Sequence, residues 1–179
     1  PGAACRSRLA QALLPLLWAS AASAQAPSLV LDHLTTDDGL PQATVMTSLQ
    51  DSQGFVWLGT EDGLVRYDGR ELHRYARSRT ENDSLPGNYV WQVVEDADTN
   101  LWIALDGAGV AKWNRSTDRF LSYRHDASNG SSLASDRVRT VLVDARGSIW
   151  IGTYDAGVDV LAPKSGDILH LRRGPNDLG

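Results

Sequence analysis

Residues 51–60 read DSQGFVWLGT, and residues 144–153 read DARGSIWIGT. Between them, residues 96–105 read DADTNLWIAL, with Asp and Trp at the same two places. The three segments follow one another at intervals of 45 and 48 residues. Self-similarity at a fixed interval of this size is the sequence signature of a repeat protein. We therefore expect a chain built from stacked units of one kind.

Four positions keep the same spacing in all three units, which makes chance a poor explanation. They are Leu40, Leu85 and Leu133; Val45, Val90 and Val138; Asp51, Asp96 and Asp144; and Trp57, Trp102 and Trp150. Each of these aspartates is expected to accept a backbone N–H two residues further on, in an Asx turn. Each of these tryptophans is expected on the second strand of its unit, where a large ring can fill the wedge between neighbouring units.

Every unit divides into four short apolar and β-branched runs separated by Asp, Gly and Asn turns, a pattern that predicts strands. The expected strands are residues 45–49, 55–60, 64–67 and 71–75, then 90–96, 100–105, 110–114 and 119–124, then 138–144, 148–153, 158–161 and 167–171. Four strands at this period predict an all-β fold of β-propeller blades. Gly54 and Gly147 suit a left-handed turn, and we expect that turn to be altered in the middle unit, where Thr99 replaces glycine.

The first 24 residues have the pattern of a secretory signal peptide. Arg6 and Arg8 precede a short apolar run over residues 9–18, and residues 22–24 (ASA) offer a small-residue cleavage site. An amphipathic N-terminal helix is the alternative. Cleavage would remove the only cysteine and make a chain of net charge −5 more acidic. The predicted product is exported, and its acidity gives no reason to expect nucleic acid as a partner.

The segments at 51–60 and 144–153, with residues 38–45 (DGLPQATV), closely resemble the two-component regulator propeller repeat. The middle unit is less similar because Ala104-Leu105 stands in place of Gly-Thr. The resemblance covers about residues 29–179. It implies a periplasmic sensor region, commonly a seven-bladed propeller, followed in the whole protein by a membrane span and an output module. That module is often a histidine kinase and sometimes a diguanylate cyclase.

On this basis we expect three blades, which are too few to close a propeller ring. We place them at about 40–84, 85–132 and 133–179, with an extra closing strand at 29–34. The sequence is therefore expected to be cut at both ends. Unpaired blade faces would leave the chain alone marginally stable or prone to aggregate.

No catalytic, cofactor or metal motif stands out. The four histidines share no repeat position. Residues 96–100 resemble the start of a Ca²⁺ loop, but Leu101 replaces the glycine that such a loop requires at its sixth position, and Gly107 replaces the glutamate at its twelfth. We therefore expect neither catalysis, nor a cofactor, nor a metal site in this chain.

The candidate ligand-binding positions are those where the repeats differ, at the start of the first strand of each unit. The loops entering these strands and the loops between second and third strands are expected on one face of the propeller. The candidates are Thr44, Tyr89 and Arg137 at one repeat position, Met46, Trp91 and Arg139 at a second, and Asn88 and Asp136 at a third. Aromatic and charged groups on loops would suit a carbohydrate or small polar ligand. The alternative is that these positions differ only because exposed residues are free to vary. Trp113 is not a candidate, because we expect its ring to pack inside the fold.

The predicted function is ligand sensing by the periplasmic region of a transmembrane signalling protein anchored in the inner membrane. Its expected partners are the ligand, the remaining blades, membrane-proximal segments and a second copy of the whole protein. An exported propeller enzyme (lyase or hydrolase) and a structural interaction module are the alternatives, which the gene beyond Gly179 would distinguish.

Overall fold

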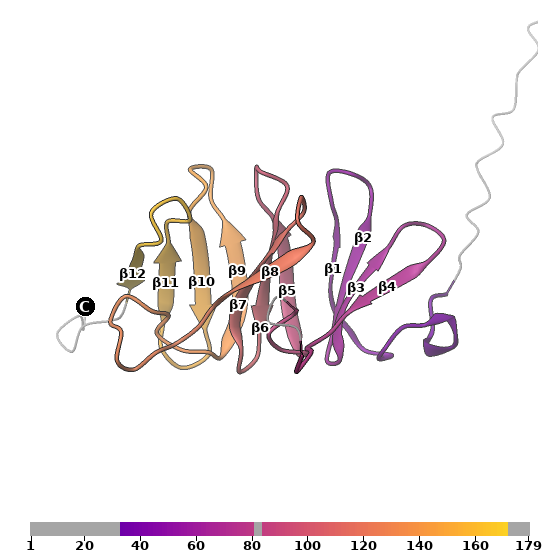
Figure 1. The fold of residues 1–179 in the computed structure, drawn as a ribbon, viewed down its shortest axis with the longest axis horizontal. Helices are drawn as coiled ribbons and strands as arrows, with labels where there is room; N and C mark the ends of the chain where they lie inside the picture. The colour runs from indigo at the N-terminus through magenta and orange to yellow at the C-terminus, as the bar shows by residue number, and fades with distance from the viewer. Residues whose placement is uncertain (1–32, 81–83, 172–179) are drawn as a thin grey trace, which may run out of the picture. The chain divides into compact units, whose positions relative to one another are not determined.

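The structure, a computed structural model, describes residues 33–80 and 84–171 (Figure 1). Within these residues, three four-stranded antiparallel sheets follow one another along the chain. One short 3-10 helix, η1 (Thr36–Asp38), precedes them. Thr35 is its N-cap residue, and the Thr35 side chain accepts the N–H of Asp37. The expected signal peptide and most of the expected closing strand at 29–34 lie outside the described residues.

In each sheet the strands pair in chain order. The first sheet contains β1 (Val45–Gln50), β2 (Val56–Thr60), β3 (Gly63–Tyr67) and β4 (Leu72–Tyr75). The second contains β5 (Val90–Glu95), β6 (Leu101–Leu105), β7 (Gly109–Asn114) and β8 (Arg119–Tyr123). The third contains β9 (Val138–Val143), β10 (Ile149–Thr153), β11 (Val158–Leu161) and β12 (Ile168–Leu171). The predicted strands are confirmed to within one residue at each end, and so is the all-β fold of propeller blades.

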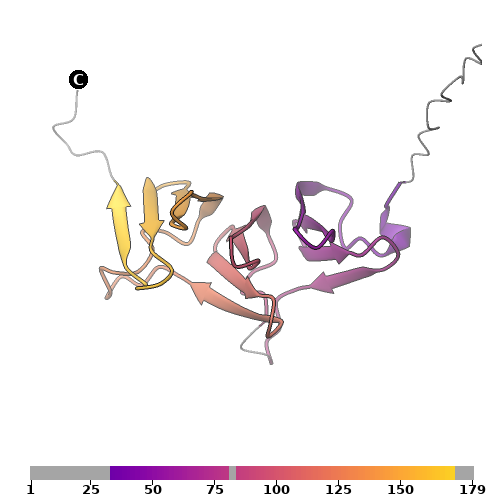
Figure 2. The ribbon, with the colours of Figure 1, turned by 90° about the horizontal axis from the view of Figure 1, so that it is seen from above.

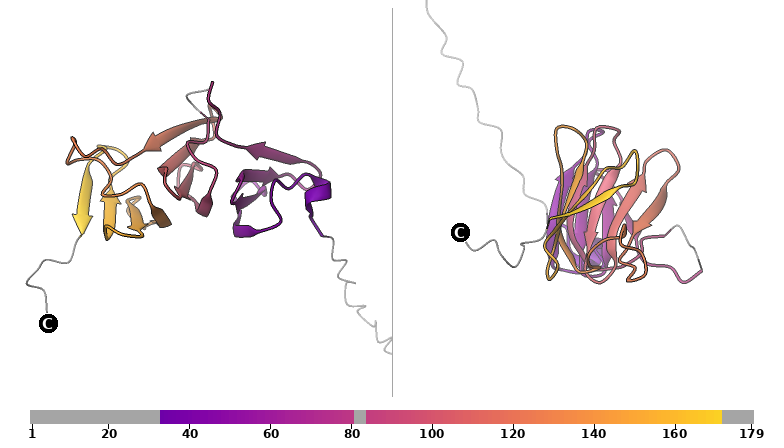
Figure 3. Two further views of the ribbon diagram at one scale, coloured as in Figure 1. Left: turned by 90° about the horizontal axis from the view of Figure 1, so that it is seen from below. Right: turned by 90° about the vertical axis from the view of Figure 1, so that its left-hand side faces the viewer.

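The three sheets lie side by side, with their first strands β1, β5 and β9 adjacent (Figures 2 and 3). Two apolar clusters hold them together. Trp57 of the first sheet is fully buried against Leu101 and Trp113 of the second. Trp102 of the second sheet is fully buried against Ile149 of the third. These two tryptophans and Trp113 therefore do the packing that the repeat pattern predicts.

Trp150 stands at the same register position in the third sheet but is 39% exposed. Its cross-strand neighbour Leu142 and, further along the same row, Leu169 are exposed as well. In each earlier sheet the tryptophan at this position is covered by the sheet that follows, whereas Leu121, the counterpart of Leu169 in the second sheet, is exposed there too. Since no fourth sheet occurs in residues 33–80 and 84–171, this apolar row remains open, as the predicted unpaired blade face requires.

The aspartate turns are confirmed, with an addition that the sequence pattern did not reveal. Oδ1 of Asp51 accepts the N–H groups of Gln53 and Phe55, and Oδ2 accepts the indole N–H of Trp57 at 2.8 Å. Asp96 and Asp144 bind the tryptophans six residues after them in the same way, at 2.9 and 3.1 Å. One carboxylate therefore shapes the turn and also fixes the ring that packs between sheets.

The expectation of an altered turn at Thr99 is wrong. Thr99 donates its N–H to the carbonyl of Asp96 just as Gly54 does to Asp51 and Gly147 to Asp144. Its φ of 63° lies in the left-handed region. The hydrogen bonds to Asp96 outweigh the steric cost of this conformation for a β-branched residue, so all three turns are alike.

Candidate functional site

The segments that enter β5 and β9 lie on the same face as the turns between second and third strands. Backbone hydrogen bonds join them: Gly63 N–H to the carbonyl of Asn88, and Gly109 N–H to the carbonyl of Asp136. We call this the loop face and define it by residues 61–62, 76–80, 84–89, 106–108, 125–137 and 154–157. The predicted grouping of these loops is confirmed.

Each first strand contains a β-bulge at its second residue. The register shifts between Val45 and Thr47, between Val90 and Gln92, and between Val138 and Thr140. The extra residues are Met46, Trp91 and Arg139. A bulge leaves one residue out of the ladder and turns its side chain in a new direction, which is why bulges recur beside functional sites. Three of the predicted ligand-binding positions are therefore the three bulged positions.

Four of the predicted residues and one further residue form what we call the aromatic–arginine cluster: Tyr89, Trp91, Arg137, Arg139 and Tyr154. The rings of Tyr89 and Trp91 are 4.8 Å apart. The guanidinium of Arg139 lies 4.0 Å from the centre of the Trp91 ring and 5.0 Å from that of Tyr154. Arg137 lies 4.1 Å from the Tyr154 ring. Cation–π stacking of this kind orders two arginines and joins the second sheet to the third.

Three carboxylates border the cluster, so its charges are mixed. They are Glu61, which accepts the Tyr89 hydroxyl at 3.1 Å; Asp106, 4.0 Å from Arg139; and Asp155, 3.4 Å from Arg137. Burial and the bond to Glu61 raise the pKa of Tyr89, so this phenol is neutral at physiological pH. A bond from Ser135 and the charge of Arg137 lower the pKa of Asp155. The cluster therefore offers both donors and acceptors, without a strong excess of either charge.

The remaining predicted residues do not join this cluster. Oδ1 of Asn88 accepts the N–H of Arg77, and Oδ1 of Asp136 accepts the N–H of His125, in both cases eleven residues earlier in the chain. These two side chains brace equivalent loops. Thr44 directly precedes β1 of the first sheet, and Met46 is the bulged residue of β1. Their role as ligand contacts stays a prediction.

Sequence reasoning missed Tyr154, which is 60% exposed and forms the open surface of the cluster. It directly follows the last residue of β10, as Glu61 follows β2 and Asp106 follows β6. A change from an acid to an aromatic ring at one repeat position is the same kind of signal that identified Trp91. Comparing the turns as well as the first strands would have found it.

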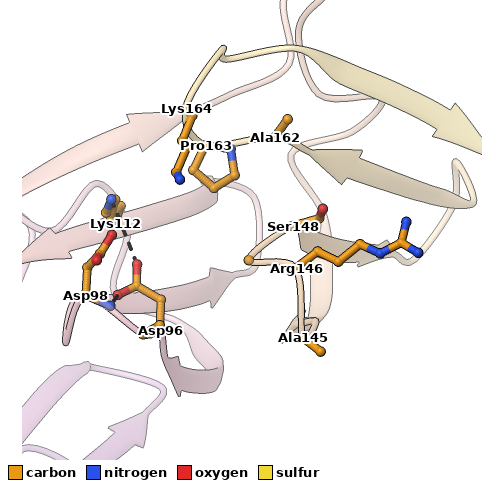
Figure 4. Close-up of a pocket in the computed structure, with 11 residues that line it drawn as sticks. Asp96, Asp98, Lys112, Ala145, Arg146, Ser148, Ala162, Pro163 and Lys164 are labelled. Carbon is orange, nitrogen blue, oxygen red and sulfur yellow. Dashed lines mark hydrogen bonds and ion pairs between the residues drawn. The ribbon is translucent and has the colours of Figure 1, made fainter.

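A hollow of about 340 Å³ lies between the second and third sheets, beside the turns that join first and second strands (Figure 4). Its charged lining residues are Asp96, Asp98, Lys112, Arg146 and Lys164. In Figure 4 the side chain of Arg146 extends away from the other labelled charges. The acids and the lysines therefore balance, and none of the predicted site residues lies here.

The hollow has a structural origin. The strand registers place Pro163 of the third sheet at the position of Arg115 in the second. Between the first two sheets, Arg115 occupies the corresponding space and donates to Asp51, Gln53 and the carbonyl of Thr99. Proline cannot make these bonds, so the space between the second and third sheets is less filled.

A family model described as the two component regulator propeller matches residues 39–62, 84–107 and 132–155, one match in each repeat. The chain carries three two-component regulator propeller repeats. It is 28% identical to the extracellular domain of the putative hybrid two component system BT3049 from B. thetaiotaomicron, with a TM-score of 0.74. That likeness covers 79% of this chain and 20% of the other.

Two further relatives extend the comparison. "Histidine kinase P4" of Formosa agariphila is 33% identical over 73 residues, which is 41% of this chain. PorZ, a surface component of the type-IX secretion system of Porphyromonas gingivalis, shares the fold with a TM-score of 0.54 at 20% identity, over 66% of this chain and 17% of its own. This chain spans only 5% of the kinase and 20% of the BT3049 domain. The part of the chain that the structure describes contains no helix of the length and apolarity needed to cross a membrane.

Proposed function

We propose that the chain belongs to the exported, periplasmic sensor region of a two-component signalling protein, and that its loop face binds a small polar or carbohydrate ligand. The repeats and the likeness to an extracellular domain of a hybrid two component system support the sensor role. The whole protein would be anchored in the inner membrane. A histidine kinase output is the first choice because of the kinase relative, with a diguanylate cyclase as the alternative.

The aromatic–arginine cluster is the observation that carries ligand binding. It is built from positions that differ between repeats, on or next to strands whose framework positions are the same in every repeat. It combines an exposed ring with ordered hydrogen-bonding groups, the combination that binding sites for small polar molecules use. No residue of this chain is assigned a catalytic role.

Signalling would follow from a shift of population. A ligand that binds one arrangement of the propeller and its membrane-proximal segments more tightly than another biases the equilibrium between them. The remaining blades and a second copy of the whole protein are the proposed partners.

A reporter experiment tests this function. The full-length protein is expressed in its own host, and output of its signalling pathway is measured during growth on a range of saccharides. Tyr154→Ala, which removes the open ring of the cluster, should reduce the response to the active saccharide at least tenfold. Lys164→Ala, an exposed change outside the loop face, is the matched control and should respond as the unmodified protein does. Equal responses of the two variants would contradict the proposal.

A further inference from the structure

Trp91 differs from every other tryptophan that the structure describes. The indole N–H groups of Trp57, Trp102 and Trp150 bind the turn aspartates, and that of Trp113 binds Asp118 at 2.8 Å. Nε1 of Trp91 is buried and has no acceptor among residues 33–80 and 84–171. A buried donor without a partner costs about 1–3 kcal/mol, so its presence calls for an explanation.

Arg139, which stacks on the Trp91 ring, also has little hydrogen bonding to the described residues. Its one ion pair in the described part of the chain is the 4.0 Å approach to Asp106, which is beyond hydrogen-bond distance. Arg115 shows the contrast, because it bonds Asp51 at 2.8 Å and Thr99 at 2.9 Å. The guanidinium of Arg139 is held in place by ring stacking, with its N–H groups free to meet an incoming acceptor.

Both residues are bulged, which places two under-used donors next to each other from neighbouring sheets. We infer that Trp91 Nε1 and the Arg139 guanidinium together receive an oxygen acceptor of the ligand, while the ring of Tyr154 supports the ligand's apolar face. Because Nε1 is covered in the structure, the side chains over it have to move aside as the ligand enters. This inference rests on the proposed function and names the residues that would determine its specificity.

The charge balance indicates the class of ligand. Arg137 lies beside Asp155, Arg139 lies near Asp106, and Glu61 accepts the hydroxyl of Tyr89, so an anion would meet carboxylates and a cation would meet guanidiniums. A hydroxyl group both donates and accepts, and it can use both kinds of partner. The lining therefore selects an uncharged ring that bears hydroxyl groups, such as a neutral sugar, over an acidic one.

The test uses Trp91→Phe in the full-length protein, because phenylalanine keeps an aromatic ring under Arg139 and removes the N–H. The probes are a set of neutral oligosaccharides and the matching uronic-acid oligosaccharides, and binding is measured by titration calorimetry. We expect the neutral set to contain the tighter ligand, and Trp91→Phe to bind it about tenfold more weakly, equivalent to roughly 1.4 kcal/mol. Arg139→Met, which retains the stem over the ring, should weaken binding to a similar degree.

Thermal unfolding separates recognition from a structural role. Removing a donor without a partner should leave the melting temperature of Trp91→Phe unchanged or higher. Trp150→Phe, which removes an indole N–H bound to Asp144, is the control and should bind the probe normally. Unchanged affinity of Trp91→Phe, or a fall in both affinity and stability, would overturn the inference.

The probe set also separates this inference from the proposed function. Preference for the uronic-acid set would overturn the ligand class and leave ligand sensing intact. The absence of binding to every probe also overturns the ligand class. If Tyr154→Ala then left the pathway response unchanged as well, the proposed function would fall with it.

Discussion

Nη2 of Arg115 in the second sheet lies 2.8 Å from Oδ2 of Asp51, whose side chain is completely buried in the first sheet. The same guanidinium approaches Glu95 at 3.4 Å. Asp51 in turn holds the ring of Trp57. One arginine therefore links a turn, a core tryptophan and the neighbouring blade.

Arg115→Met should lower the free energy of unfolding by about 3 kcal/mol, because it leaves the buried carboxylate of Asp51 without its cation. Urea unfolding of the chain would measure the loss. Arg70→Met, in the exposed turn between β3 and β4, serves as the control for removing a positive charge. Similar losses for both variants would show that the ion pair contributes little.

Acid should destabilise the chain through Asp51. Burial raises the pKa of this carboxyl, but bonds from Trp57, Arg115 and two backbone N–H groups outweigh burial and hold the pKa below its ordinary 3.8. The unfolded chain therefore binds the proton more readily, so the stabilisation is complete above about pH 5 and is lost as the pH falls below 3.8. Urea titrations between pH 3 and 7 would show this fall. A curve that stays flat down to pH 3 would contradict it.

Pro163→Arg should stabilise the contact between the second and third sheets. Its guanidinium would reach the space lined by Asp96 and Asp98, as Arg115 does one blade earlier. We expect a gain of about 1 kcal/mol, the usual net contribution of one intramolecular hydrogen bond. Pro163→Ala controls for the loss of proline rigidity, and an arginine variant no more stable than the alanine variant would contradict the prediction.

Thr99→Gly should raise the free energy of unfolding by about 1 kcal/mol. Relief of the left-handed conformation is worth roughly 1–2 kcal/mol, and part of it is offset by the greater freedom of glycine in the unfolded chain. Gly147→Thr, the reverse change in the third sheet, should destabilise by a similar amount. Thermal unfolding checks both changes: the melting temperature should rise for Thr99→Gly and fall for Gly147→Thr.

Trp57→Ala should cost about 3–5 kcal/mol, as expected for a fully buried ring, and Trp150→Ala less than half as much in this chain. If a further repeat follows and covers the third sheet, the cost of Trp150→Ala should rise toward that of Trp57→Ala in the longer protein. Comparing the two variants in both lengths by urea unfolding checks this. Equal costs in the short chain would contradict the exposure of Trp150.

Local sequence was sufficient wherever a structural feature depends on residues close together in the chain. Alternating apolar runs and Asp–Gly turns define the strands, because side-chain periodicity and turn conformation are decided within a few residues. The spacing of Trp57, Trp102 and Trp150 predicted the repeats for the same reason. Differences between repeats also identified Trp91 and Arg139 as candidates for the site.

Tertiary structure decided what depends on the register and neighbourhood of sheets. The left-handed Thr99 follows from the bonds that Asp96 makes, which prevail over residue preference. The stacking of Arg139 between Trp91 and Tyr154 needs two bulges and two adjacent sheets, so residues up to 63 positions apart meet. The burial of Trp57 and the exposure of Trp150 differ only in whether a sheet follows. A repeat pattern states what each blade contains, whereas packing between blades determines which of its groups are satisfied and which remain open to a partner.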